Sequence, residues 1–157
     1  MMPTATPPPG PEGNANAAAL ARIVQAFESL SPASVAALDT LYTPHARFKD
    51  PFNDVRGLAD IQRIFSHMYV ALDRPHFVVT HTIQQGSHSF LTWEFRFRFR
   101  RFDTRTLQCI EGGSHLQLAP DGRILSHRDY WDAAEELYEK LPVLGGLMRW
   151  LKRQANR

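Results

Sequence analysis

Helical spacing dominates the first half of the chain. Apolar residues recur every three or four positions over residues 17–30 and again over residues 58–72, as expected for helices with one buried face. A shorter amphipathic helix is predicted over residues 34–42, and a short strand over residues 47–50. We therefore expect three helices and one short strand in this half.

The spacing changes to strand periodicity in the second half. Four segments with apolar residues at alternate positions follow one another, separated by sequences typical of turns. They are residues 76–84, 90–102, 107–118 and 123–131. Helices followed by an antiparallel meander predict an α+β domain in which helices cover one face of a sheet.

The two ends of the chain differ from this domain. Residues 1–16 contain five prolines and little that can be buried, and they are expected to form a disordered tail. The domain is assigned to residues 17–133 and a C-terminal helical extension to residues 134–157. Within the extension, residues 147–153 are apolar on one side and basic on the other. We expect this helix to pack on the domain or on a second copy, and contact with a membrane surface is the less favoured alternative.

Composition narrows the class of protein. A chain of 157 residues suits one domain, and its net charge of +2 gives no reason to expect a nucleic-acid or membrane partner. The single cysteine, Cys109, excludes an internal disulfide and agrees with a reducing cytoplasm, which is the expected location. No apolar run approaches the ~18 residues of a membrane span, and no signal peptide is recognisable.

The order of elements and several local sequences resemble the nuclear-transport-factor-2-like superfamily, in particular its SnoaL-like and ketosteroid-isomerase-like domains. The matching segments are 24–27, 48–52, 57–61, 121–124 and 128–132. The resemblance implies a cone-shaped, curved antiparallel sheet wrapped around three N-terminal helices. It also implies a pocket enclosed between helices and sheet.

The resemblance assigns roles to individual positions. Steroid isomerases of this superfamily keep their general base just before a proline, where this chain has Asp50. Their oxyanion hole needs a tyrosine and a protonated aspartate, and these positions correspond here to Phe27 and Ser114. This chain therefore keeps a carboxylate at the position of the general base but lacks the tyrosine and the aspartate of the oxyanion hole. For Asp50, the alternative is a turn-forming role.

Epoxide hydrolases of the superfamily suggest a second constellation. Their last-strand carboxylate corresponds to Asp129, and the acid and arginine of a middle strand correspond to Glu94 and Arg96 in reversed order. Strand alternation places Glu94 and Arg96 on the face opposite the Trp/Phe stripe of residues 93–99. With the family register, we expect the charged face to line the pocket and Arg96 to pair with Asp129. The alternative is that this face is simply the solvated side of the sheet.

The candidate site residues fall into two groups. The catalytic candidates are Asp129, Asp50, Arg96, Glu94 and His127, with Asp129 as the base, Arg96 and His127 orienting it, and Asp50 as a second acid or base. The ligand-binding candidates are Phe27, Ile64, Met68, Ser114, Leu116 and Trp131.

Other chemistries are less well supported. The seven histidines lack metal-ligand spacing, so neither a metal nor another cofactor is expected. The alternating Arg and Phe residues of segment 95–105 are similar to an aromatic–basic nucleic-acid surface, but the glycines of an RNA-recognition motif are missing. The tripeptide 127–129 matches the kinase catalytic loop without its asparagine or a Gly-rich loop, and is a chance match.

The favoured function is binding of a small hydrophobic molecule in an enclosed pocket. The chemistry would be that of a cofactor-independent isomerase or cyclase, or of a hydrolase, using carboxylate acid–base catalysis. The alternative is a non-catalytic ligand-binding or dimeric scaffold domain, and the sequence leaves the choice open. The resemblance further implies a homodimer formed through the outer face of the sheet.

Overall fold

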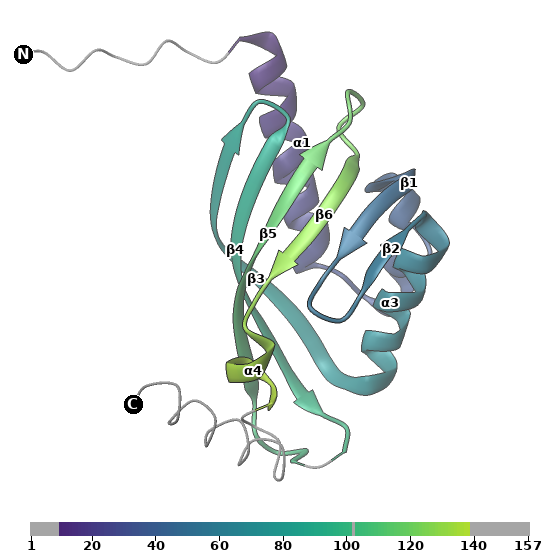
Figure 1. The fold of residues 1–157 in the computed structure, drawn as a ribbon, viewed down its shortest axis with the longest axis vertical. Helices are drawn as coiled ribbons and strands as arrows, with labels where there is room; N and C mark the ends of the chain where they lie inside the picture. Colours follow the sequence, from purple (N-terminus) through teal and green to yellow (C-terminus); the bar gives the residue numbers. More distant parts are fainter. Residues whose placement is uncertain (1–9, 102, 139–157) are drawn as a thin grey trace, which may run out of the picture.

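The computed structural model describes residues 10–101 and 103–138, which form one curved sheet with helices packed around it (Figure 1). The N-terminal elements are α1 (Pro11–Glu28), α2 (Pro32–Val35), the 3-10 helix η1 (Leu38–Thr40), β1 (Tyr42–Lys49), β2 (Asp54–Arg56) and α3 (Leu58–Ala71). The C-terminal elements are β3 (Leu72–Gln85), β4 (His88–Phe99), β5 (Gln108–Leu118), β6 (Ile124–Tyr130) and α4 (Ala133–Glu136). The predicted α+β class is confirmed.

The sheet contains six strands in the order β2-β1-β6-β5-β4-β3. Neighbouring strands are antiparallel except for β1 and β6, which are parallel. The meander β3 to β6 therefore gains β1 at its last strand, and β2 forms the edge beyond it. The long strands curve around α1 and α3, and this curvature creates the inner face on which the site lies (Figure 1).

Helix α1 is longer than predicted. It begins at Pro11, so residues 11–16 are helical and the expected disordered tail is too long. Proline is favoured in the first helical turn because its missing N–H needs no partner there, and Glu12 in the same turn interacts favourably with the helix dipole. Residues 1–9 lie outside the described part of the chain.

The segment between α1 and β2 also differs from the prediction. The expected helix over residues 34–42 is reduced to α2, which is closed by a reciprocal Ser31–Ser34 capping box, and to η1. Strand β1 then begins at Tyr42, five residues before the predicted strand, because this part of the chain pairs with β6 from Tyr42 and Ile124 onward. Pro44 is incompatible with a continuing helix.

The four predicted strands of the meander are present with small changes in their ends. Strand β3 starts at Leu72, directly after α3, and the expected break at residues 73–75 is a bulge in which Arg74 has φ +49°. Strand β4 stops at Phe99, three residues before its predicted end. Most of the predicted C-terminal extension, residues 139–157, lies outside the described residues, which end shortly after the one-turn helix α4.

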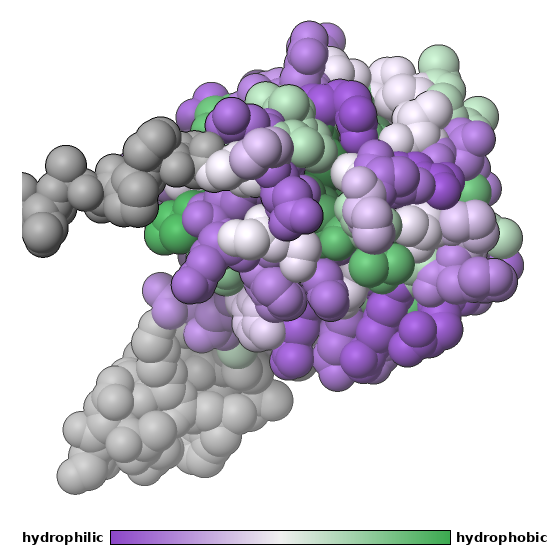
Figure 2. Space-filling view, turned by 90° about the horizontal axis from the view of Figure 1, so that it is seen from above, coloured by the Kyte–Doolittle hydropathy of each residue, from purple (hydrophilic) through white to green (hydrophobic). Residues whose placement is uncertain are grey.

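The core lies between the helices and the inner face of the sheet. Ile23 and Phe27 of α1 and Ile61 and Phe65 of α3 are at most 7% exposed. Seen from above, the surface is largely hydrophilic, with hydrophobic residues only in small patches (Figure 2). None of the described helices is both long enough and apolar enough to span a membrane.

Candidate functional site

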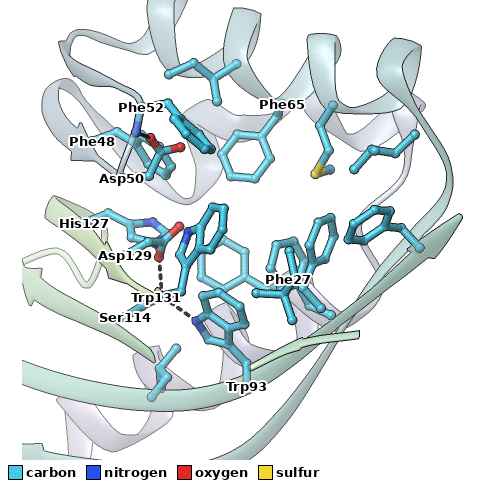
Figure 3. Close-up of a pocket in the computed structure, with 18 of the residues that line it drawn as sticks. Phe27, Phe48, Asp50, Phe52, Phe65, Trp93, Ser114, His127, Asp129 and Trp131 are labelled. Carbon is cyan, nitrogen blue, oxygen red and sulfur yellow. Dashed lines mark hydrogen bonds and ion pairs between the residues drawn. The ribbon is translucent and has the colours of Figure 1, made fainter. Parts of the chain in front are cut away.

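A cavity of about 290 Å³ lies between the inner face of the sheet and helices α1 and α3. Its described lining is apolar except for four side chains, Asp50, Ser114, His127 and Asp129. Figure 3 shows these four grouped at one side of the pocket, with aromatic rings around the rest. A mainly apolar cavity with a few convergent polar groups is the usual form of a small-molecule site.

Strand β6 supplies two of the polar groups. His127 and Asp129 are two positions apart and therefore point to the same, inner face. Their side chains meet directly, with His127 Nε2 2.7 Å from Asp129 Oδ1. The strand register places Ser114 of β5 directly opposite Asp129, and the Ser114 hydroxyl donates to the same Oδ1 over 2.5 Å.

Two buried residues extend this network. The Trp93 indole N–H donates to Ser114 Oγ over 2.8 Å, and the Tyr42 hydroxyl lies 2.7 Å from His127 Nδ1. Complete burial, together with the nearby negative charge of Asp129, raises the pKa of the Tyr42 phenol well above its usual value. Tyr42 therefore keeps its proton at neutral pH.

Asp129 has its two oxygens in different surroundings. Oδ1 accepts hydrogen bonds from Ser114 and has His127 as its second partner, whereas Oδ2 has no hydrogen-bond donor among the described residues. The side chain is 15% exposed and lines the pocket. One oxygen is thus held in place, and the other is left without a donor from the described residues.

Asp50 also lines the pocket, but its carboxylate is engaged in a turn. Oδ1 accepts hydrogen bonds from the backbone N–H groups of Phe52 and Asn53 over 2.8 and 2.6 Å, and the Asn53 side-chain amide reaches both oxygens over 3.0 Å. This is the turn-forming role that the sequence left open.

Glu94 and Arg96 lie outside the pocket, contrary to expectation. They pair with each other, Nη2 to Oε2 at 2.5 Å, with 29% and 46% of their side chains exposed. The predicted pair between Arg96 and Asp129 is not formed. The reason is that the apolar positions of β4, including Phe95 and Phe97, face the helices and line the cavity, which leaves the charged positions on the solvent side.

The ligand-binding candidates are mostly brought together. Phe27, Ile64, Met68, Ser114 and Trp131 line the cavity, whereas Leu116 is fully buried and does not. The aromatic wall that β4 and β3 give the cavity was not predicted, although the alternation of Phe and Trp along the sequence marks it. Among the residues described, no group of three or more metal-ligating side chains occurs.

The family is identified by the sequence itself. The model of the SnoaL-like domain matches residues 20–127, which is more than half of the chain. The chain belongs to the SnoaL-like domain family. A comparison with curated proteins finds no match.

Solved structures share the fold of this SnoaL-like domain. A SnoaL-like polyketide cyclase, so described, from Jannaschia sp. CCS1 superposes with a TM-score of 0.68 at 14% identity, covering 83% of this chain and 94% of that one. An LEH-like epoxide hydrolase from M. tuberculosis has a TM-score of 0.65 at 15% identity, covering 91% and 99%. A protein with a ketosteroid isomerase-like fold from Catenulispora acidiphila, crystallised with trimethylamine, has a TM-score of 0.65 at 16% identity, covering 76% of this chain and 88% of that one. At these identities the likeness establishes the nuclear-transport-factor-2-like fold.

Proposed function

We propose that this SnoaL-like domain binds a small, mainly hydrophobic molecule in the cavity and that Asp129 removes a proton from it. The observation that carries the proposal is the carboxylate of Asp129, which lines an aromatic cavity and whose Oδ1 is held by His127 and Ser114 while Oδ2 has no donor among the described residues. A general base must combine a fixed position with a free basic atom, and Oδ2 meets both requirements.

The lining of the cavity favours proton transfer over epoxide hydrolysis. No guanidinium belongs to the described lining, and Arg96, the candidate from the hydrolase comparison, is on the outer face. The proposed reaction is therefore of the isomerase or cyclase type, which needs a base and no arginine beside it. The structural neighbour named as a SnoaL-like polyketide cyclase agrees with this class.

The polar groups of the cavity also suggest which carbon acids suit it. The Trp93 N–H is committed to Ser114, and Ser114 and His127 are committed to Asp129, so the Trp131 indole N–H is the one donor of the described lining left for a developing oxyanion. A substrate deprotonated here must therefore stabilise most of the resulting negative charge by its own delocalisation. We propose a 1,3-dicarbonyl or similarly conjugated carbonyl compound.

Deuterium exchange tests this proposal without knowledge of the natural substrate. The probe is 1-phenylbutane-1,3-dione in D2O. Loss of its C2 proton signal is followed by NMR, and the rate of loss in buffer without protein is subtracted. We expect exchange catalysed by the protein, and we expect Asp129→Asn to lower it by about 10²- to 10⁴-fold. Asp39→Asn, the same change at an exposed site, should leave the rate unchanged. Acetophenone, whose enolate is not delocalised over a second carbonyl, should show little catalysed exchange.

Equal exchange by the wild-type protein and Asp129→Asn would remove Asp129 from the mechanism. Binding is followed separately by quenching of tryptophan fluorescence, since Trp93 and Trp131 line the cavity. Saturable binding of the dione with no exchange would favour the alternative function, a non-catalytic ligand-binding domain.

We further propose that the domain forms a homodimer through the outer face of the sheet. Ile83 and Phe90 are cross-strand neighbours there and are 69% and 37% exposed, and Tyr130 of β6 is 46% exposed. Light scattering should give a dimer for the wild-type protein and a monomer for Phe90→Asp, and a monomeric wild-type protein at high concentration would contradict the proposal. The cytoplasmic location stays a prediction from the single cysteine.

A further inference from the structure

We infer that Tyr42, which does not line the cavity, is a positioning residue that acts on Asp129 through His127. In this inference the Tyr42 hydroxyl donates to Nδ1 of His127 and thereby commits His127 to donate from Nε2 to Asp129 Oδ1. The inference rests on the proposed role of Asp129 as the base. It adds a residue on β1, behind the pocket wall, to the machinery that prepares that base.

Tyr42 is the donor in its hydrogen bond with His127. Its side chain is 0% exposed, and its hydroxyl has His127 Nδ1 as its hydrogen-bond partner at 2.7 Å. A phenol has one proton to donate, and leaving that proton unpaired in a buried site costs free energy. Donation to Nδ1 avoids this cost, so Nδ1 is the acceptor in this pair.

The direction of that bond determines the tautomer of the His127 imidazole. When Nδ1 accepts, the single ring proton of the neutral imidazole is on Nε2, which lies 2.7 Å from Asp129 Oδ1. Packing holds the ring in this orientation, because the Phe48 ring meets it edge-on at 4.8 Å and the Tyr42 ring lies parallel to it, within 5°. His127 is itself only 4% exposed.

Two series of hydrogen bonds converge on Oδ1 of Asp129. Tyr42 and His127 form one chain to Oδ1, and Trp93 and Ser114 form the other. In both chains every donor points toward Asp129. The arrangement stabilises the ionised carboxylate at Oδ1 and leaves Oδ2 as the oxygen that meets the substrate.

The direct test is 15N NMR of the histidine nitrogens in the unmodified protein at neutral pH. The His127 signals are assigned by their loss in His127→Gln, since the chain has seven histidines. We expect an unprotonated, hydrogen-bonded Nδ1 and a protonated Nε2. A proton on Nδ1, in either the other tautomer or the imidazolium, would overturn the inference. This measurement requires neither a substrate nor a folded Tyr42 variant.

A pair of tyrosine variants tests the effect on the base. Tyr42→Phe should shift the Nδ1 signal and lower the exchange rate of the dione by ~3- to 10-fold, about the value of one hydrogen bond, with unchanged dione affinity. Tyr69→Phe is the matched control, because the Tyr69 hydroxyl is buried with no hydrogen-bond partner among the described residues and Tyr69 does not line the cavity. It should change neither readout.

The outcomes separate this inference from the proposed function. The expected His127 tautomer without any catalysed exchange would overturn the role of Asp129 as the base, and with it the positioning role of Tyr42, while the hydrogen-bond directions stand. Catalysed exchange that Tyr42→Phe leaves unchanged would overturn the positioning role alone.

Discussion

Two strands of the same sheet each carry a pair of polar residues two positions apart, and the two pairs have opposite surroundings. His127 and Asp129 on β6 are in contact at 2.7 Å with 5% and 15% of their side chains exposed. Glu94 and Arg96 on β4 are in contact at 2.5 Å with 29% and 46% exposed. The residue types and distances alone do not distinguish a site from a surface pair.

The two pairs differ in how deeply they are buried and in which face of the sheet their side chains point to. An exposed ion pair contributes about 0–1 kcal/mol, because water competes for both charges and salt screens them. A buried carboxylate is tolerated only when donors satisfy it, and Asp129 receives donors on Oδ1 from two separate chains. The geometry of the buried pair, His127 with Asp129, is therefore constrained, whereas that of the exposed pair, Glu94 with Arg96, is not.

The largest expected effect contrasts neighbouring positions of β4. Phe97 is 2% exposed and belongs to the core, so Phe97→Ala should lower the free energy of unfolding by about 3–5 kcal/mol. Arg96→Ala, one position away on the outer face, should change it by about 0–1 kcal/mol. Urea unfolding followed by circular dichroism measures both, and similar losses would contradict the assignment of the two faces.

The packing of Trp93 gives the next effect. A Cβ atom at Gly112 would lie 2.5 Å from Cη2 of the Trp93 indole, so Gly112→Ala should displace the ring and cost about 1–3 kcal/mol. Gly10→Ala is the control, because nothing lies within 4 Å of its added Cβ. Thermal unfolding and tryptophan fluorescence report the two changes. An unshifted emission spectrum in Gly112→Ala would show that the indole does not depend on this contact.

Ser114 and Glu94 allow a second comparison, between a hydrogen bond of the buried network and one of the exposed pair. Ser114→Ala leaves the buried Trp93 N–H without its acceptor and Asp129 with one donor fewer, which should cost about 1–3 kcal/mol of stability. Glu94→Gln on the outer face should cost about 0–1 kcal/mol, and less at high salt. Chemical unfolding at low and high ionic strength separates them. A salt-sensitive Ser114→Ala would contradict the buried character of the inner network.

The smallest effect is the pH response of another exposed pair, Arg47 with Asp54, which joins β1 to β2. The hydrogen bond from Arg47 holds the pKa of the Asp54 carboxyl at about 2, below its usual value of 3.8. Because the folded pKa is depressed, its stabilising contribution is present above about pH 4 and is lost as the pH falls through 2. The stability difference between wild type and Asp54→Asn should vanish across this window in acid unfolding, and a constant difference would contradict it.

The fold was predictable because two periods in the chain are unmistakable. Helical spacing ahead of strand spacing is enough for an α+β domain, and the resemblance supplied the curved sheet. The phase of β4 was not predictable from alternation, which defines two faces without saying which one the helices cover. Assigning Glu94 and Arg96 to the pocket followed the hydrolase comparison, and burial of Phe97 and its aromatic neighbours decided otherwise.

The site was predictable only where a local motif marks it. His127 and Asp129 stand in the last-strand sequence that resembles the family, and both line the cavity. Tyr42 has no local signal, because its partner His127 is 85 residues away in the chain and only the parallel β1–β6 pairing brings them together. For Asp50, the sequence allowed either a place in the pocket or a turn-forming role, and the side chain both lines the pocket and bonds within the turn.

In the proposed mechanism, Oδ2 of Asp129 is the atom that meets the substrate. A crystal structure of the protein with 1-phenylbutane-1,3-dione bound would locate that contact. We expect the dione inside the aromatic cavity, with its C2 carbon about 3–3.5 Å from Oδ2 and with Oδ1 still bonded to His127 and Ser114. A dione seated against Asp50, or bound on the outer face beside Glu94 and Arg96, would contradict it.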